Sequence, residues 1–195
     1  MAKTNEQIRN ILAQFQLSEK VIAAEPFGNG HINDTLKVID EQGKIHYVLQ
    51  RVNHQIFTNV DMLQRNIEIV TTHIRKKLEA RGEADIDRKV LTFLPTRDGK
   101  NYYFDGDSYW RVSLFIPRSK SYEEVTPELS FEAGRAFGDF QTMLSDLPEG
   151  TLGETIPDFH NMEFRLRQFQ EAVTTDPAGR AEEVKPLIEE IDRRA

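Results

Sequence analysis

The chain has 195 residues, 38% of them hydrophobic, which is enough to bury one good core or two small ones. Its formal net charge of −7 and isoelectric point near 5.3 argue against binding to nucleic acid or to an anionic membrane, because both would repel it. It contains no cysteine, which excludes disulfides and thiolate metal sites, and no apolar run approaches the length of a membrane span, so we expect a cytoplasmic protein.

The first part of the chain predicts a short helix followed by antiparallel strands. Thr4 and Gln7 form a capping box, which is typical of a helix N-terminus. Apolar residues then recur at one-face helical spacing, at Ile8, Ile11, Leu12 and Phe15. Three extended segments separated by turn residues follow, at residues 21–27, 35–39 and 45–51.

A long amphipathic helix interrupts the strand pattern. It is expected to begin near Thr58 or Asn59 and to stop at Gly82. Its apolar stripe consists of Leu63, Ile67, Val70, Ile74 and Leu78. Three further strands are expected at residues 90–94, 101–104 and 109–116, joined by Arg97-Asp98-Gly99 and Asp105-Gly106-Asp107, which are typical of hairpin turns. The sequence therefore predicts about five or six strands with a single inserted helix.

The rest of the chain predicts helices. Pro117 ends the last strand, and residues 117–125 form a polar connector. Thr126 and Pro127 open a helix whose apolar face holds Leu129, Ala133, Ala136, Phe137, Phe140 and Leu144. Further helices are expected from about Asn161 to Val173 and from Asp176-Pro177 onward. We therefore divide the chain into a strand-rich domain (1–116), a connector (117–125) and a helical region (126–195).

The segment from Phe27 to Thr35 carries the most chemical information. Its glycines, Gly28 and Gly30, allow positive φ angles and close approach of the backbone to a ligand, and Asn33 tolerates the left-handed conformation. A dinucleotide fingerprint would open a helix here, and a Walker loop would need Gly-Lys-Ser/Thr, whereas this segment continues into a strand and lacks that triplet. A glycine-rich hairpin between antiparallel strands covers the ATP phosphates in protein kinases. An ordinary hairpin with a flexible turn is the alternative interpretation.

The candidate nucleotide-binding residues of this segment are Gly28, Asn29, Gly30, His31, Asn33 and Thr35. In protein kinases the third strand adds a cation, which an acidic residue of the next helix holds in place. Here Gln50 occupies the usual lysine position and Arg51 follows it, and strand alternation allows only one of them to face the nucleotide. Glu68 is the natural acidic partner, although a solvated glutamate is an equally good interpretation of it.

Four segments carry a resemblance to a known family. They are Gly28-Asn29-Gly30-His31-Ile32-Asn33-Asp34-Thr35, Tyr47-Val48-Leu49-Gln50-Arg51-Val52-Asn53, Trp110-Arg111 with Phe115-Ile116, and Ile156-Pro157-Asp158-Phe159-His160-Asn161. In this order, and over nearly the whole chain, they resemble the N-acetylhexosamine 1-kinases of the aminoglycoside phosphotransferase family. The resemblance implies an α+β, protein-kinase-like fold, with an antiparallel nucleotide-binding N-lobe that has one inserted helix, followed by the first helices of an incomplete helical C-lobe.

The resemblance also implies a reaction and a hinge. The γ-phosphate of ATP, bound with Mg²⁺, would be transferred to the anomeric 1-hydroxyl of an N-acetylhexosamine, a small sugar. The hinge would run from Phe115 to Pro117, where backbone groups of Phe115 and Ile116 would bind adenine. His160 and Arg165 are candidate substrate-binding residues near the cleft between the lobes, although a histidine before a helix more often caps or packs.

The catalytic loop of that family has no counterpart in these residues. None of the five histidines begins a His-x-Asp pattern or its His-Asn/Gly-Asp variant, so we assign no catalytic residue and no metal ligand. We therefore expect these residues to be the amino-terminal portion of a kinase, inactive alone. Apolar helix faces after Thr126 would then lack cover, which opens a route to self-association.

Two alternatives to a kinase remain, a nucleotide-binding pseudokinase and a regulatory or interaction module without nucleotide. The spacing of Trp110, Phe137 and Phe140 favours core packing over a stacking platform.

Overall fold

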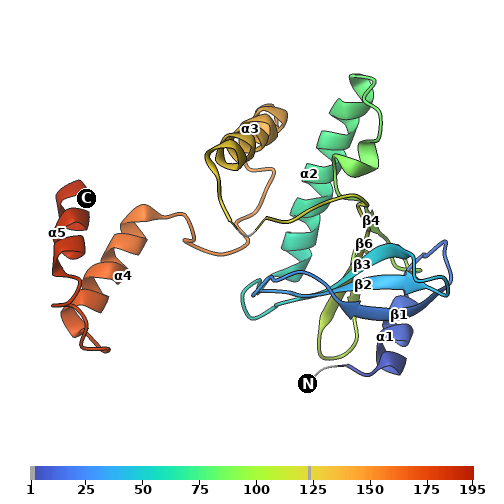
Figure 1. The fold of residues 1–195 in the computed structure, drawn as a ribbon, viewed down its shortest axis with the longest axis horizontal. Coiled ribbons are helices and arrows are strands. Elements are labelled where there is room, and N and C mark those ends of the chain that lie inside the picture. The colour runs from blue at the N-terminus through green and yellow to red at the C-terminus, as the bar shows by residue number, and fades with distance from the viewer. Residues whose placement is uncertain (1–2, 123) are drawn as a thin grey trace. The chain divides into compact units, whose positions relative to one another are not determined.

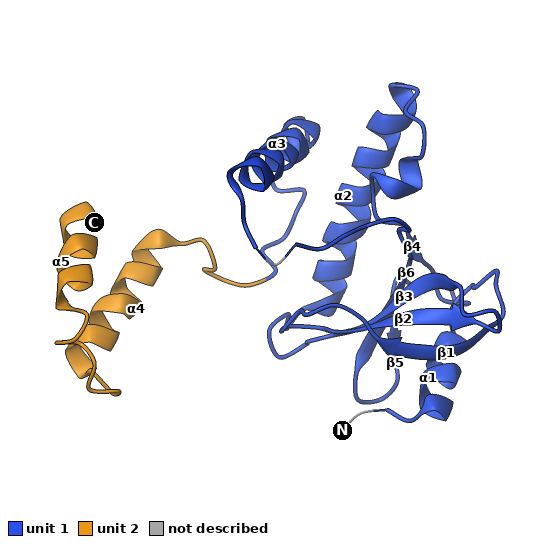
Figure 2. Ribbon diagram, viewed as in Figure 1, with its two compact units in different colours: residues 1–155 blue, residues 156–195 orange. Residues whose placement is uncertain are grey.

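The computed structural model describes residues 3–122 and 124–195 and shows an α+β protein with an antiparallel sheet (Figure 1). Contacts between Cα atoms divide the chain into two compact units, residues 1–155 and 156–195 (Figure 2). The helices of the described residues are α1 (Asn5–Leu12), α2 (Val60–Ala80), α3 (Pro127–Leu144), α4 (Met162–Thr175) and α5 (Lys185–Arg194), with a 3-10 turn, η1, at Ile86–Arg88. The strands are β1 (Val21–Pro26), β2 (Asp34–Asp40), β3 (Ile45–Val52), β4 (Phe93–Leu94), β5 (Tyr103–Phe104) and β6 (Tyr109–Leu114).

The predicted sheet with one inserted helix is confirmed. Its strands follow the order β1-β2-β3-β6-β4, and β5 pairs with β6 as a hairpin. Every pair is antiparallel, and α2 is the α-helix between β3 and β4. In the register, Thr35 pairs with Gln50, and Gln50 pairs with Arg111 on β6. Because alternate residues point to opposite faces, Thr35, Gln50 and Arg111 lie in one row on one face.

The opposite face of the sheet forms the main core with α1. The expected capping box of Thr4 and Gln7 is present, and Ile8, Ile11 and Leu12 are buried. They pack with buried sheet residues, which are Val38, Tyr47, Leu49, Trp110 and Val112, and with Phe15. Trp110 is 2% exposed, so its predicted core role is confirmed. Figure 1 shows α1 and α2 on opposite sides of the sheet.

Helix α2 is capped by Asn59, whose side chain accepts a hydrogen bond from the amide of Met62. Of its predicted stripe, Ile74 and Leu78 are buried and pack with Val90 and with Met143 and Leu144 near the end of α3. The first unit therefore extends past residues 117–125 and includes α3.

The three strands predicted after α2 are each shorter than expected, since residues 101–104 form a strand only at Tyr103–Phe104 and the strand predicted at 109–116 ends at Leu114. Of residues 90–94 only Phe93 and Leu94 pair in the sheet, because the amide of Val90 bonds to the carbonyl of Ile86 at 3.0 Å and continues the η1 turn. Val90 is then buried beside α2 instead of lying in the sheet. Both predicted turns are present, with Gly99 and Gly106 at positive φ.

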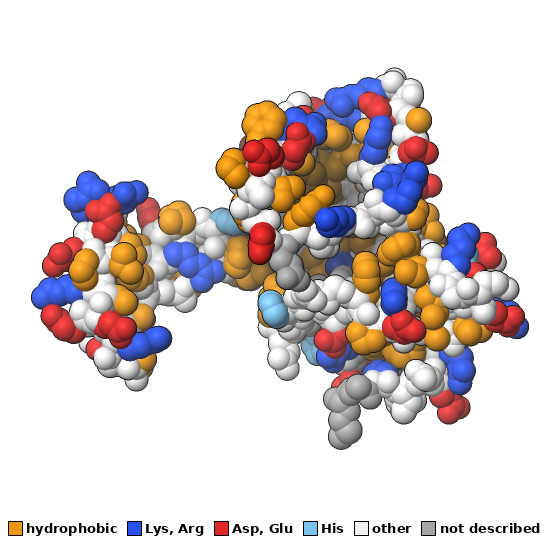
Figure 3. Space-filling view, in the orientation of Figure 1, with side chains coloured by type: hydrophobic (Ala, Val, Ile, Leu, Met, Phe, Trp, Pro, Cys, Tyr) orange, Lys and Arg blue, Asp and Glu red, His pale blue; other side chains and the backbone are white. Residues whose placement is uncertain are grey.

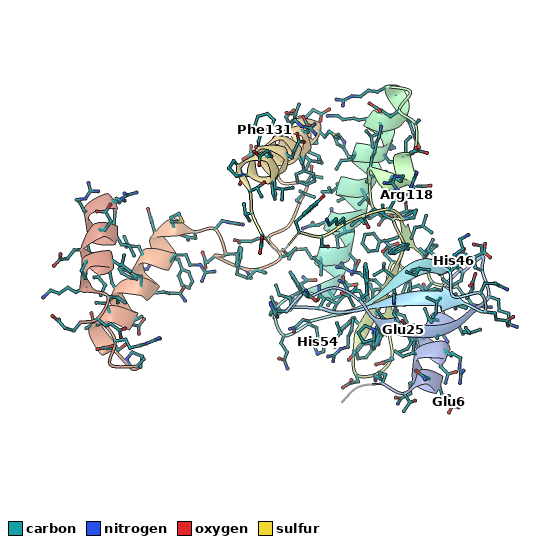
Figure 4. The ribbon with its side chains drawn as sticks, viewed as in Figure 1. Glu6, Glu25, His46, His54, Arg118 and Phe131 are labelled. Atoms are coloured by element: carbon teal, nitrogen blue, oxygen red, sulfur yellow. The ribbon has the colours of Figure 1, made fainter. Side chains whose placement is uncertain are left out.

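Helix α3 begins where expected, with Thr126 as its cap, but none of its described residues is buried. Phe137 is 71% exposed and Phe140 is 44% exposed, so their predicted core role is wrong, whereas the expectation of uncovered apolar faces is confirmed for this helix. Hydrophobic side chains are visible on its surface in Figure 3, and Phe131 projects from it in Figure 4. Helical periodicity alone does not reveal whether a second layer covers a helix.

The second unit consists of α4, α5 and the loop between them. Asn161 caps α4 as predicted, but no helix begins at Asp176. Asp176 takes the left-handed conformation with φ 38° and ends α4, and its carboxylate accepts hydrogen bonds from the amides of Arg180 and Ala181. The loop thus continues to Val184, and α5 starts at Lys185. None of the helices in the described residues is long and apolar enough to cross a membrane.

Candidate functional site

The glycine-rich segment forms the predicted hairpin between β1 and β2. The amide of Phe27 donates to the carbonyl of Thr35 at 2.9 Å and closes it. Gly28 has φ 82°, as predicted, whereas neither Gly30 nor Asn33 has a positive φ. Asn33 has another role, because its Oδ1 accepts a hydrogen bond from the amide of Asn53 at 2.8 Å. That bond fixes the base of the hairpin to the end of β3.

The Asn33 bond gives a direct test of hairpin order. Asn33→Ala should destabilise the fold by about 1 kcal/mol, because the amide of Asn53 loses its acceptor. Hydrogen exchange at residues 27–35 should accelerate in the same variant, as measured by mass spectrometry. His31→Ala is the matched control, since His31 is exposed and lies in the same hairpin. Equal exchange in both variants would show that Asn33 does not order the hairpin.

A pocket of about 350 Å³ lies on the sheet face opposite α1. Its described lining residues are Phe27, Val48, Gln50, Leu91, Phe93, Arg111, Ser113, Leu114, Phe115, Ile116 and Ser119. The volume falls within the roughly 300–1,000 Å³ typical of small-molecule pockets. We call it the hinge pocket, because residues 114–116 leave the sheet along one wall.

The backbone of the hinge is partly used by the fold. The amide of Phe115 donates to the carbonyl of His46 at 2.9 Å, at the β3 end marked by His46 in Figure 4. Phe115 therefore cannot use its amide for a ligand while this bond stands. The carbonyl of Ile116 accepts from the Ser119 hydroxyl at 3.0 Å, and the rings of Phe27 and Phe115 meet edge to face at 5.8 Å. These contacts bring the hairpin and the hinge to the same pocket.

Gln50 and Arg51 lie on opposite faces of the sheet, as strand alternation requires. Gln50 lines the hinge pocket, whereas Arg51 lines a second pocket of about 650 Å³ on the α1 face. Arg51 is 41% exposed and donates through Nε to Asp34 at 2.6 Å. Gly28, Gly30, Asn33 and Thr35 also border the second pocket, whereas Phe27 lines both pockets.

Arg111 is the pocket residue for which the sequence suggested no role. Its Nε donates to Oε1 of Gln50 at 2.9 Å, and Gln50 donates through Nε2 to the Thr35 hydroxyl at 2.9 Å. The guanidinium lies over the Phe93 ring, 5.3 Å from its centre. Burial lowers the pKa of Arg111 to about 10. A correct alignment of β6 beside β3 would have placed Arg111 next to Gln50, but strand order cannot be read from periodicity.

Glu68 does not meet a cation of β3. Its Oε2 accepts a hydrogen bond from Nδ2 of Asn101 at 2.7 Å, and it borders a separate pocket with Gln64 and Arg75. Gln64 itself is buried, and its Nε2 has no hydrogen-bond partner among the described residues.

The candidate substrate residues His160 and Arg165 both belong to the second unit. His160 stacks edge to face on Phe159, and Nε of Arg165 donates to the Phe159 carbonyl at 3.2 Å.

The described residues contain no group of three or more His, Asp or Glu side chains that could hold a metal ion. No model of a known protein family matches the chain.

Proposed function

We propose that residues 1–195 are the ATP-binding portion of a small-molecule kinase with a protein-kinase-like fold, of the aminoglycoside phosphotransferase type. The observation that carries the proposal is the hinge pocket, where Phe27 at the base of a glycine-rich hairpin meets Phe115 at the end of β6. A hairpin over one side of a pocket and a strand end along another is the arrangement by which kinases hold a nucleotide.

The pocket residues suit the two ends of a nucleotide. Val48, Leu91 and Phe27 offer apolar surface to an adenine ring, and the amide of Ile116 is the next hinge donor after that of Phe115. The hairpin amides near Gly28 and Gly30 would bind phosphate oxygens. Arg111 is a positively charged residue on the same pocket wall, so an anionic ligand fits.

The proposed reaction is transfer of the γ-phosphate to a sugar hydroxyl, by resemblance the anomeric 1-hydroxyl of an N-acetylhexosamine. Magnesium belongs to that reaction, but no cluster of ligands for it exists among the described residues, so we derive no step through it. No histidine begins a His-x-Asp pattern, so these residues offer no base of that type for the hydroxyl proton. We propose a cytoplasmic location, because the proposed reaction consumes ATP.

The proposal predicts weak ATP binding without transfer by a polypeptide of residues 1–195. Positioning and charge neutralisation supply nearly all catalysis of phosphoryl transfer, and residues 1–195 contain no His-x-Asp pattern of a catalytic loop. Calorimetric titration with ATP measures binding, and a coupled ADP-release assay with N-acetylglucosamine and N-acetylgalactosamine measures transfer.

Gly30→Val is the control for this experiment. A Cβ at Gly30 meets no atom within 4 Å, so the variant should fold, while the branched side chain should block close approach of phosphates to the hairpin. Turnover at an ordinary kinase rate would contradict the prediction that residues 1–195 transfer no phosphate. Binding without turnover is the expected result, and the pseudokinase interpretation shares it. No binding at millimolar ATP would favour an interaction module without nucleotide.

A further inference from the structure

Arg111 is a largely desolvated cation without a charged partner among the described residues. Its Nη1 is buried and has no hydrogen-bond partner among the described residues. Gln50, which accepts from Nε and Nη2, supplies a neutral carbonyl oxygen rather than a carboxylate. Burial of a cation without an opposite charge is unfavourable, so the fold retains this arginine at the expense of stability.

Three cations of neighbouring elements differ from Arg111 in that each has a carboxylate partner. Arg51 pairs with Asp34, Lys37 pairs with Glu25 at 3.0 Å, and Arg75 pairs with Asp87 at 2.7 Å. Of the described residues that line the hinge pocket, Arg111 is the only charged one. Among these four cations of the described residues, Arg111 is the one without a carboxylate partner, and its charge lies at the hinge pocket.

Hydrogen bonds connect Arg111 to the glycine-rich hairpin. The row Thr35, Gln50 and Arg111 crosses three neighbouring strands, and each member bonds to the next. Thr35 also closes the hairpin through its carbonyl, which accepts from Phe27. A phosphate bound by the hairpin on this face of the sheet would lie near Thr35, Gln50 and Arg111. The hydrogen bonds that Arg111 donates to Gln50 would then orient the guanidinium toward the phosphate.

We propose that Arg111, from β6, binds the phosphate groups of the nucleotide, in place of the lysine that protein kinases carry on the third strand at the position of Gln50. This inference rests on the proposed function. A phosphate would give the guanidinium an anionic acceptor and an opposite charge, which the neutral carbonyl oxygen of Gln50 does not supply. Gln50 is then a positioning residue, and Arg51 on the other face has no part in binding.

The test compares two charge-removing variants, Arg111→Met and Arg51→Met, in the chain of residues 1–195. Each loses one positive charge, but only Arg111 lines the hinge pocket. Affinities for ATP, ADP and adenosine are measured by calorimetry. Arg111→Met should weaken ATP binding by about 10- to 30-fold and leave adenosine binding within about 2-fold, whereas Arg51→Met should leave both within about 2-fold.

A second readout checks the unpaired charge itself. Replacing a poorly paired buried ion by an apolar side chain is often neutral or stabilising, so Arg111→Met without ligand should melt at or above the wild-type temperature. If Arg111→Met does not fold, Arg111→Lys replaces it, and weaker binding of ATP but not of adenosine is again the expected result.

The outcomes separate this inference from the proposed function. Equal weakening of ATP and adenosine in the Arg111 variant, or no weakening of ATP, would overturn the role of Arg111 while leaving nucleotide binding intact. The role of Arg111 would also be overturned if the wild-type protein bound adenosine as tightly as ATP. Wild-type protein that binds neither would overturn the proposed function, and this inference with it.

Discussion

Val48→Phe should lower ATP affinity by at least about 100-fold while leaving the fold intact. Val48 lies on β3 between Lys37 and Ser113 on the neighbouring strands, and its side chain lines the hinge pocket. A phenylalanine there would extend into a space of about 350 Å³ that adenine is proposed to fill. Because the new ring enters an existing cavity rather than a packed core, the strain of overpacking should be small. Calorimetry with ATP and thermal melting measure the two effects.

Ile22→Phe is the matched control, since Ile22 is a 41% exposed strand residue remote from the pocket lining. It makes a similar change in size, and it should leave ATP affinity within about 2-fold. A folded Val48 variant that binds ATP as tightly as the wild type would place the nucleotide elsewhere. The pocket beside Arg51, on the opposite face, would then be the site to examine by the same approach.

The sheet could be predicted because its signals are local. Alternating apolar residues and turn chemistry marked β1, β2 and β3 to within one residue at each end, and the Thr4 capping box marked α1. Each of these features depends on neighbours a few residues away in sequence. The hairpin at Gly28 was found for the same reason, since a positive φ needs only the right residue at the turn.

The errors arose where the same residues allow two local structures. Val90 was predicted as strand, but it follows the η1 turn and packs beside α2 instead. Asp176-Pro177 predicts a helix start, but Pro177 follows the left-handed Asp176, whose carboxylate accepts a hydrogen bond from the amide of Arg180 in the loop. A proline after a helix end and a proline at a helix start look alike in sequence.

In the candidate site, some residues could be found from the local sequence pattern and others only from the pairing of strands. Gln50 and Arg51 were identified in the third strand, but only the strand alternation of the folded sheet assigned Gln50 to the hinge pocket. Arg111 is distant from both in sequence and became a candidate through its pairing with Gln50. Glu68 followed the expected pattern of a kinase clamp, and the structure gives it Asn101 as its partner. Spacing along the chain therefore located the strands, whereas cross-strand register was needed to find the polar row.

Asp105→Asn should destabilise the protein by about 2–4 kcal/mol at neutral pH, because Asp105 holds the β5–β6 turn to the core. Its side chain is only 10% exposed and accepts from the Trp110 indole at 2.9 Å and from the amide of Ser108 at 2.8 Å. It also pairs with Lys3 at 2.9 Å. An asparagine that keeps its oxygen toward the turn amides would turn its NH₂ group toward the indole N–H, so two donors would face each other.

The charge of Asp105 should also make stability depend on pH. Burial raises its pKa, but hydrogen bonds from Lys3, the Ser108 amide, Trp110 and the Asp107 amide outweigh burial and lower the pKa to about 2. The unfolded value is near ~3.9. Because the folded pKa is the lower one, the stabilisation is fully present above about pH 4 and is lost as the pH falls toward 2, by ~2.5 kcal/mol in total.

Urea unfolding at pH 7 and at pH 3 measures both effects, with Asp107→Asn as the control in the same turn. Asp107 has a side chain that is 76% exposed, and its substitution should change stability by about 0.5 kcal/mol or less. The difference between wild type and Asp105→Asn should shrink at pH 3, since the carboxyl of Asp105 is then mostly protonated in the unfolded state but still mostly ionised in the folded state. Equal stability of Asp105→Asn and Asp107→Asn at pH 7 would show that Asp105 does not anchor the turn.

Trp110 precedes Arg111 on β6. If the bond from Trp110 to Asp105 helps to position Arg111, Asp105→Asn should also weaken the binding of ATP more than the binding of adenosine.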